Sequence, residues 1–137
     1  RHEPVYTSEE AAAVRGATLS SGAKALVCKV DRGFVLIVLP ANLKLASKRV
    51  RKARGVKSLR FASREEVSDI TALQPGSIPP FGSLFELPTW CDHRLAAEAT
   101  INFNAGDHAI SINMPYAEFV RVEQPLLGDF GDPPAQE

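Results

Sequence analysis

Two apolar runs in the first third of the chain predict a β-hairpin. Residues 25–30 and 34–39 are rich in valine, leucine and isoleucine, and each run has the length of a buried strand. Residues 31–33, Asp-Arg-Gly, separate the runs, and the glycine can supply the positive φ angle of a tight turn. Neither run approaches the roughly 20 apolar residues that a membrane-spanning helix needs.

Polar residues at two places have the spacing of a helix-capping box. In such a box a hydroxyl and a carboxylate three residues apart satisfy backbone N–H groups at the start of a helix. Thr7-Ser-Glu-Glu10 predicts a helix over residues 8–15, which Gly16 is placed to stop. Ser63-Arg-Glu-Glu66 predicts a second helix that runs to about residue 71.

A helical periodicity follows the predicted hairpin. Ala46, Val50 and Ala53 recur at positions i, i+4 and i+7, and basic residues fill most of the other positions. The pattern predicts an amphipathic basic helix over residues 46–54 that ends at Gly55. Shorter runs predict strands at 58–62, 89–92, 99–104 and 108–113, and Pro115 favours the start of a short helix over 115–120.

The interleaved strands and helices indicate an α/β fold, and 137 residues are enough for one core. The content of 45% apolar and 23% charged residues is typical of a globular domain. We expect the domain to cover residues 1–122 and residues 123–137, rich in glycine and proline, to form a flexible tail. Because the chain begins at Arg1 rather than at methionine, we expect that a preceding segment is missing. Because no signal peptide is recognisable, we expect a cytoplasmic location.

The two cysteines, Cys28 and Cys91, do not form a pattern of known chemistry. They lie far apart without a CxxC pair, so neither a disulfide framework nor a zinc site is predicted. Cys91, Asp92 and His93 are consecutive, and neighbouring residues on a strand point to opposite faces. We therefore expect no metal and no cofactor, and a structural role for Asp92.

The charge of the chain is zero overall but very unevenly distributed. No acidic residue occurs from 32 to 64, whereas eight basic residues lie between Lys44 and Arg60. Beyond Arg64 the chain has two basic residues and twelve carboxylates. Because a polyanion responds to the local field within a Debye length of about 10 Å, we predict that the basic helix contacts phosphate groups. The alternative is an ordinary solvated helix face.

Four segments occur in an order that resembles a known family. They are Thr-Ser-Glu-Glu-Ala at 7–11, Gly-Ala-Lys-Ala-Leu-Val at 22–27, Gly-Ser-Ile-Pro-Pro-Phe-Gly at 76–82, and Asn-Ala-Gly-Asp-His at 104–108. Together they resemble the YbaK and prolyl-tRNA synthetase editing family of aminoacyl-tRNA deacylases. The resemblance covers residues 2–120, and its most specific part is the GxxxP motif at 76–80, which in the family borders the pocket for the misattached amino acid.

The resemblance implies a fold and a set of site residues. The implied fold is α/β, with a mixed, largely antiparallel, barrel-like sheet surrounded by helices. The implied catalytic residues are Lys24, Gly76 and His108. The implied substrate-binding residues are Thr7, Ala25, Ser77, Ile78, Pro79, Pro80 and Gly106. The basic stretch, independently of the resemblance, predicts the tRNA-binding residues Lys44, Lys48, Arg51 and Lys52. Relatives commonly have a polar residue where this chain has Ala25, which bears on substrate specificity.

Each implied residue type suits hydrolysis of an aminoacyl ester. The Lys24 ammonium can hold the terminal phosphate or polarise the ester, and the loop at Gly76 can offer backbone N–H groups to a developing oxyanion. His108 can orient water or a ribose hydroxyl. Thr7 can cap the helix and line the pocket at once. The ester is already activated, so the lack of a legible Ser-His-Asp triad agrees with this chemistry.

We therefore predict a trans-editing deacylase that hydrolyses a small amino acid from mischarged tRNA. Alanine on tRNA-Pro is the first expectation, with cysteine, serine and threonine as the others. The predicted partners are the tRNA acceptor end and prolyl-tRNA synthetase. We expect no association with a membrane. The alternative is a noncatalytic module on the same fold that binds tRNA or a synthetase, and an unrelated small-molecule hydrolase is a third possibility.

Overall fold

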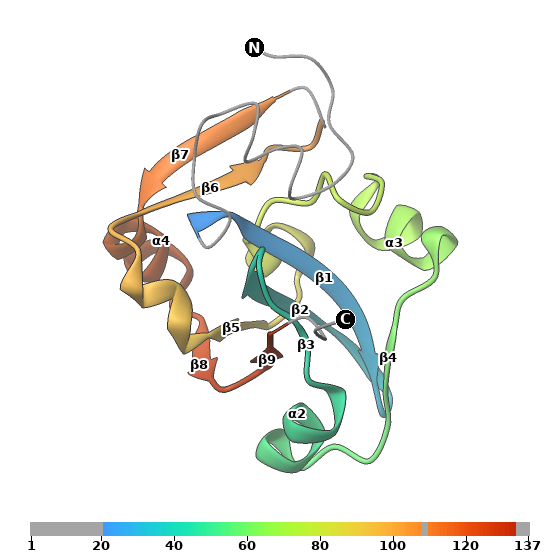
Figure 1. Cartoon of the computed structure of the whole chain (residues 1–137). Helices are drawn as coiled ribbons and strands as arrows, with labels where there is room; N and C mark the ends of the chain where they lie inside the picture. The colour runs from blue at the N-terminus through green and yellow to red at the C-terminus, as the bar shows by residue number, and fades with distance from the viewer. Residues whose placement is uncertain (1–20, 108–109, 134–137) are drawn as a thin grey trace.

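A five-stranded mixed sheet forms the centre of the computed structural model, which describes residues 21–107 and 110–133 (Figure 1). The strand order is β4-β1-β2-β5-β8. The β1–β2 and β1–β4 pairs are antiparallel, and the β2–β5 and β5–β8 pairs are parallel. The strands are β1 (Ala23–Val30), β2 (Gly33–Pro40), β4 (Leu59–Phe61), β5 (Thr89–Asp92) and β8 (Leu126–Gly128).

The predicted hairpin is confirmed, and its two apolar runs are explained by burial on both faces. Ala25, Val27 and Leu36 belong to one core cluster, whereas Cys28 and Ile37, which point the other way, belong to a second. Strands covered on both sides read as continuous apolar runs. The expected positive φ at Gly33 is wrong: Asp31 takes it, with φ 45°, and its carboxylate accepts hydrogen bonds from the backbone of Lys57 and Ser58, both at 3.0 Å.

Three helices flank the described sheet: α2 (Ser47–Arg54), α3 (Arg64–Thr71) and α4 (Tyr116–Glu123). The capping box of α3 is confirmed, because the Ser63 hydroxyl accepts from Glu66 N and the Glu66 carboxylate accepts from Ser63 N. The end of α2 at Gly55 is also confirmed, with φ 67°. Val50 is fully buried, but Ala53 is exposed and does not join the packed face as expected. The predicted helix over 8–15 lies outside the described residues.

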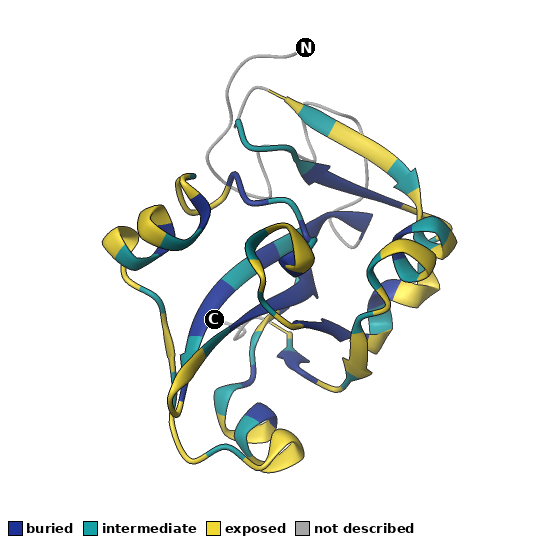
Figure 2. Cartoon of the chain, turned by 180° about the vertical axis from the view of Figure 1, so that it is seen from behind, coloured by how far each residue is buried: buried dark blue, intermediate teal, exposed yellow. Residues whose placement is uncertain are grey.

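A separate antiparallel hairpin, β6 (Thr100–Asn104) and β7 (Ser111–Pro115), lies beside the start of β1. The link is a parallel bridge between Gly22 and Asn102, supported by a 2.8 Å hydrogen bond from Asn102 Nδ2 to Ser21 Oγ. Strand β7 begins three residues later than predicted. Figure 2 shows that β6 is buried while much of β7 is exposed. Short 3-10 helices, η2 (Gly82–Phe85) and η3 (His93–Ala97), connect the remaining elements.

The segment after residue 123 is part of the fold, which corrects the expectation of a flexible tail over its described residues. Strand β8 pairs with β5, and β9 (Gly131–Asp132) pairs with β3 (Lys44–Leu45). Phe130 is 1% exposed and packs near Trp90. The cause is long-range: the buried Asp92 carboxylate accepts from the backbone N of Phe130 and Gly131 at 2.8 and 2.9 Å.

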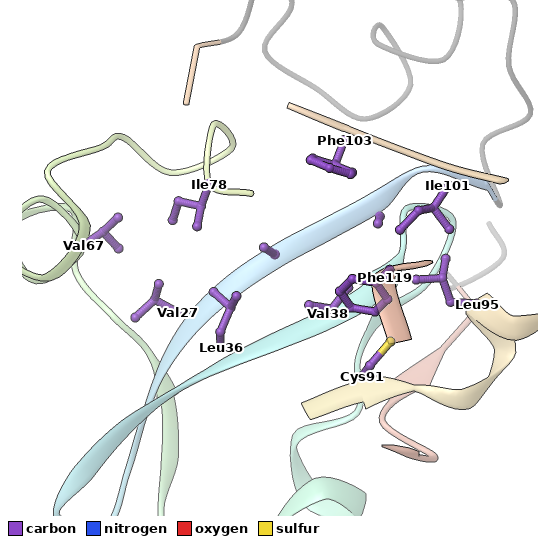
Figure 3. Packing of buried hydrophobic residues seen from close by; sticks show 12 residues of the cluster. Val27, Leu36, Val38, Val67, Ile78, Cys91, Leu95, Ile101, Phe103 and Phe119 are labelled. Carbon is purple, nitrogen blue, oxygen red and sulfur yellow. The ribbon is translucent and has the colours of Figure 1, made fainter. Parts of the chain in front are cut away.

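The predicted α/β class with a mixed sheet is confirmed. Among the described residues the edge strands β4 and β8 do not pair with each other, so the sheet curves without closing into a barrel. Figure 3 shows one core cluster, where Val67 and Ile78 lie near Val27 while Ile101 and Phe103 lie over the start of β1. No helix in the described ranges is long and apolar enough to cross a membrane.

Candidate functional site

The GxxxP segment forms a loop that is fixed by its own hydrogen bonds. Gly76 has φ 89°, in the left-handed region that favours glycine. The Ser77 N–H and hydroxyl both donate to the Gln74 carbonyl, at 3.1 and 2.8 Å. The structure gives no hydrogen-bond partner for the N–H of Gly76 or Ile78 within the described chain. The N–H groups of Gly76 and Ile78 therefore remain as donors, whereas the Ser77 N–H is bound within the loop.

The segment at 104–106 lies directly against this loop. Gly106 N donates to the Ser77 carbonyl at 2.7 Å, and Asn104 Nδ2 donates to the Gly76 carbonyl at 2.8 Å. A carbonyl only accepts, so the Asn104 amide nitrogen must face Gly76 and its oxygen is directed elsewhere. That buried oxygen has no partner in the described structure. Asn104 opens the fourth family segment, but no argument from its sequence had assigned it a role.

The start of β1 runs beside the same junction. The Gly22–Asn102 bridge is parallel, so the two segments run in the same direction from it. Lys24 and Asn104 each lie two residues after the bridge, on these two neighbouring segments. Three of the family segments, separated by up to about 80 residues in sequence, thus meet at one end of the sheet. Thr7 and His108 lie outside the described residues.

Lys24 and Ala25 leave β1 on opposite faces, as alternate residues of a strand must. Ala25 belongs to the core cluster that contains Ile78, whereas Lys24 pairs with Leu39 and shares its face with Leu26. Lys24 is half-buried and interacts with its surroundings. Since it is the second residue of β1, its side chain starts at the end of the sheet, where a flexible stem can reach past the edge.

Two cavities adjoin the GxxxP loop. A cleft of about 200 Å³ includes Ala25, Gly76 and Ile78 in its lining. A larger apolar pocket of about 510 Å³ includes Pro79 and Gly106, with phenylalanines at 81, 85 and 103. Ser77 is 2% exposed with its hydroxyl bound internally, and Pro80 is fully buried. Of the predicted substrate-binding residues, those that the structure describes thus lie in the linings of these two cavities or, like Ser77 and Pro80, are buried beside them.

Cys91 and Asp92 are fully buried and have structural roles. Burial raises the pKa of the Cys28 and Cys91 thiols to about 12, so neither supplies a thiolate near neutral pH. Burial alone would raise the pKa of Asp92, but hydrogen bonds from Arg94 and from the Phe130 backbone outweigh it and the pKa is lowered. Asp92 therefore holds Arg94 and the β8–β9 connection in place, which agrees with the structural role expected from the sequence.

The predicted tRNA-binding residues differ in their surroundings. Lys44 is exposed on β3, and Lys48 and Lys52 are exposed on α2. Arg51 is partly buried and donates to the Lys57 carbonyl at 3.5 Å. Figures 1 and 2 both place α2 at the end of the molecule opposite β6 and β7. The basic helix is thus remote from the junction of the three family segments.

Comparison with solved structures defines the class of fold. A structure described as a candidate trans-editing enzyme for prolyl tRNA synthetase is 25% identical, with a TM-score of 0.84 over 92% of this chain and 80% of that chain. A hypothetical protein of known structure, 23% identical over 95% of this chain and 87% of its own, has the same fold with a TM-score of 0.86. The fold is therefore that of the YbaK-like editing proteins.

Sequence comparison then gives the family. The aminoacyl-tRNA editing domain matches residues 2–122. The multifunctional Ser/Thr-tRNA deacylase ProXp-y of Escherichia coli K12 is 34% identical over 94% of this chain and 80% of its own length. A proline–tRNA ligase of Bacillus licheniformis is 34% identical over 77% of this chain and 18% of its own length. The chain belongs to the aminoacyl-tRNA editing domain family, whose enzymes are hydrolases of aminoacyl-tRNA ester bonds.

Proposed function

We propose that this chain is a cytoplasmic trans-editing deacylase that removes a small amino acid from the 3′ end of mischarged tRNA. The observation that supports the proposal best is the junction of the three family segments. Asn104 binds the Gly76 carbonyl, and the bridge beside it brings in the strand that carries Lys24. The junction would hold the ester between a cation and a rigid loop.

The proposed chemistry uses few groups, because the aminoacyl ester is already activated. The N–H groups of Gly76 and Ile78 would donate to the oxyanion that forms when water attacks the ester carbonyl. Such donors are most effective where they need not reorganise, and the bonds to Asn104 and Gly106 hold the loop in position. Lys24 would supply the positive charge, and His108 would orient the water, as the resemblance implies.

The small cleft is where we propose that the amino-acid side chain binds. Ala25, Gly76 and Ile78 line it together with other apolar residues, so selection would depend on the shape of these walls and on apolar contact. Alanine on tRNA-Pro is the first substrate that we propose. The name of the Escherichia coli relative favours serine and threonine esters as the second, and cysteine completes the set. We propose prolyl-tRNA synthetase as a partner because synthetases of this class contain a matching region.

The direct test is a panel of tRNAs charged with alanine, cysteine, serine or threonine, on tRNA-Pro and on non-cognate tRNAs. The purified chain should accelerate loss of at least one ester over the spontaneous rate. Preference among the four amino acids would identify the substrate. Binding of every tRNA without acceleration of any hydrolysis would instead support the noncatalytic alternative.

Lys24→Ala is the first specific prediction. Loss of the ammonium should lower deacylation at least about tenfold, which corresponds to about 1.4 kcal/mol of transition-state stabilisation. Lys29→Ala is the matched control, because Lys29 lies on the same strand but at its other end, where its ammonium is 5.2 Å from the centre of the Phe34 ring. Thermal unfolding of both variants separates catalysis from stability. Full turnover by Lys24→Ala on every active substrate would remove Lys24 from the site.

A further inference from the structure

The basic residues of α2 fall into two groups in the structure. Arg49 is held by carboxylates from the far end of the chain: Nη1 lies 3.1 Å from Asp129 Oδ1, and Nη2 lies 2.6 Å from Asp132 Oδ1. Arg54 stacks over the Trp90 ring, with 5.0 Å from its guanidinium carbon to the ring centre. These two arginines, and Arg51 through its hydrogen bond to the Lys57 carbonyl, are engaged within the protein itself.

Lys48 and Lys52 form the second group. They are one helical turn apart, both exposed, and on the side of α2 opposite the buried Val50. The described structure gives neither ammonium a carboxylate partner. Like charges at i and i+4 destabilise a helix by a few tenths of a kcal/mol. An anionic ligand would remove this cost.

These two lysines line a groove of about 510 Å³ between α2 and β9. The other lining residues are Leu45, Ala46, Ser47, Arg49 and Asp132. Asp132 would repel an anion if it were unpaired, but its carboxylate accepts the short hydrogen bond from Arg49. The Arg49–Asp132 pair therefore forms a nearly neutral wall, and the excess positive charge of the groove comes from Lys48 and Lys52.

We infer that this groove binds the phosphate backbone of the tRNA, with Lys48 and Lys52 as the contacting residues and Arg49 as a positioning residue. The inference rests on the proposed function, since it takes tRNA as the substrate. Residues 32–64 contain no carboxylate, and Asp129 and Asp132, which the C-terminal segment brings beside α2, are both paired with Arg49, so the groove keeps an excess of positive charge that favours a polyanion. Helix α2, which carries both lysines, lies at the opposite end of the molecule from β6 and β7 (Figure 1). A ligand that reaches both ends must be extended, as RNA is.

The inference separates binding from chemistry. Lysines remote from the ester add binding energy without touching the reacting atoms, so their substitution should raise KM and leave amino-acid preference unchanged. Removal of one phosphate-binding charge should reduce the slope of log K against log salt concentration by about 0.9, the value for a B-DNA duplex. Removal of both lysine charges should therefore reduce the slope by nearly two.

The experiment compares Lys48→Gln/Lys52→Gln with Lys29→Gln/Lys57→Gln, which removes the same charge from outside the groove. Binding of uncharged tRNA to the full chain is titrated between about 50 and 200 mM salt, the range over which phosphate binding changes affinity strongly. We expect the groove variant to show a smaller slope and a weaker affinity, and the control to show neither change to a comparable extent. Equal slopes for the groove variant and wild type would overturn the inference.

Two further outcomes distinguish the hypotheses. If the groove variant binds tRNA normally but no longer associates with an acidic synthetase surface, the partner is a protein and the inference is wrong. If wild type hydrolyses no ester on the panel, the proposed function fails, while the salt slopes still decide whether the groove binds RNA. Where hydrolysis is seen, the groove variant should raise KM for all active esters by the same factor.

Discussion

At the residue scale, Gly76 has a backbone conformation that favours glycine, and its N–H is one of the proposed donors. With φ 89°, a side chain at this position is disfavoured regardless of the space around it. Gly76→Ala should therefore cost about 1 kcal/mol of folding free energy and also reduce deacylation by disturbing the loop. Deacylation and thermal unfolding measured on the same preparation give both quantities.

Gly55→Ala is the control for this prediction. Gly55 has φ 67° and open space around it, and it ends α2, the helix remote from the junction of the family segments. Both alanine variants should lose similar stability, but only Gly76→Ala should lose activity beyond that loss. Equal activity in the two variants would show that the Gly76 loop is not part of the mechanism.

At the scale of the element, α3 shows how a local signal stabilises the wall of the small cleft. Its capping box holds the helix that places Val67 in the cleft lining. Ser63→Ala should lower the free energy of unfolding by about 1 kcal/mol, measured by urea denaturation, because one backbone donor loses its acceptor. Ser68→Ala, on an exposed position of the same helix, should have a much smaller effect.

The capping box also makes the stability of α3 depend on pH. The Arg60 guanidinium and the Ser63 backbone lower the pKa of Glu66 from 4.5 to about 2. A lowered folded-state pKa means that the contribution is complete above pH 4.5 and is lost as the pH falls toward 2. Glu66→Gln should remove this dependence, so an unchanged acid profile in that variant would exclude the box as its cause.

At the scale of the whole molecule, the described C-terminal segment acts as a structural part of the domain. Phe130→Ala should destabilise the fold by about 3–5 kcal/mol, because it empties a buried site beside Trp90. Leu127→Ala, on neighbouring β8 and 47% exposed, should cost far less. Unfolding curves for the two variants test this comparison. If both variants lost only a small and similar free energy of unfolding, the C-terminal segment would not stabilise the fold.

The sequence by itself determined the elements whose causes are local. The apolar runs predicted β1 and β2 because a strand buried on both faces needs continuous apolar residues, and Ser63 with Glu66 predicted the start of α3 because both caps lie within one turn. The order of the family segments predicted the fold class and the family. These signals act within a few residues or are carried by motifs, so they are legible without coordinates.

Only the tertiary structure decided what depends on partners distant in sequence. The glycines and aspartates around Phe130 predicted a flexible segment. In the fold, the buried Asp92 carboxylate accepts hydrogen bonds from the backbone of Phe130 and Gly131 and holds the segment in place. In the sequence Arg49 and Lys48 are equivalent basic residues of one helix. In the fold, Asp129 and Asp132, 80 and 83 residues away in the chain, pair with Arg49 and neutralise its charge. The hydrogen bond of Asn104 to Gly76 also needed the fold. In each case a hydrogen bond or ion pair between distant segments sets the role, and sequence spacing carries no record of it.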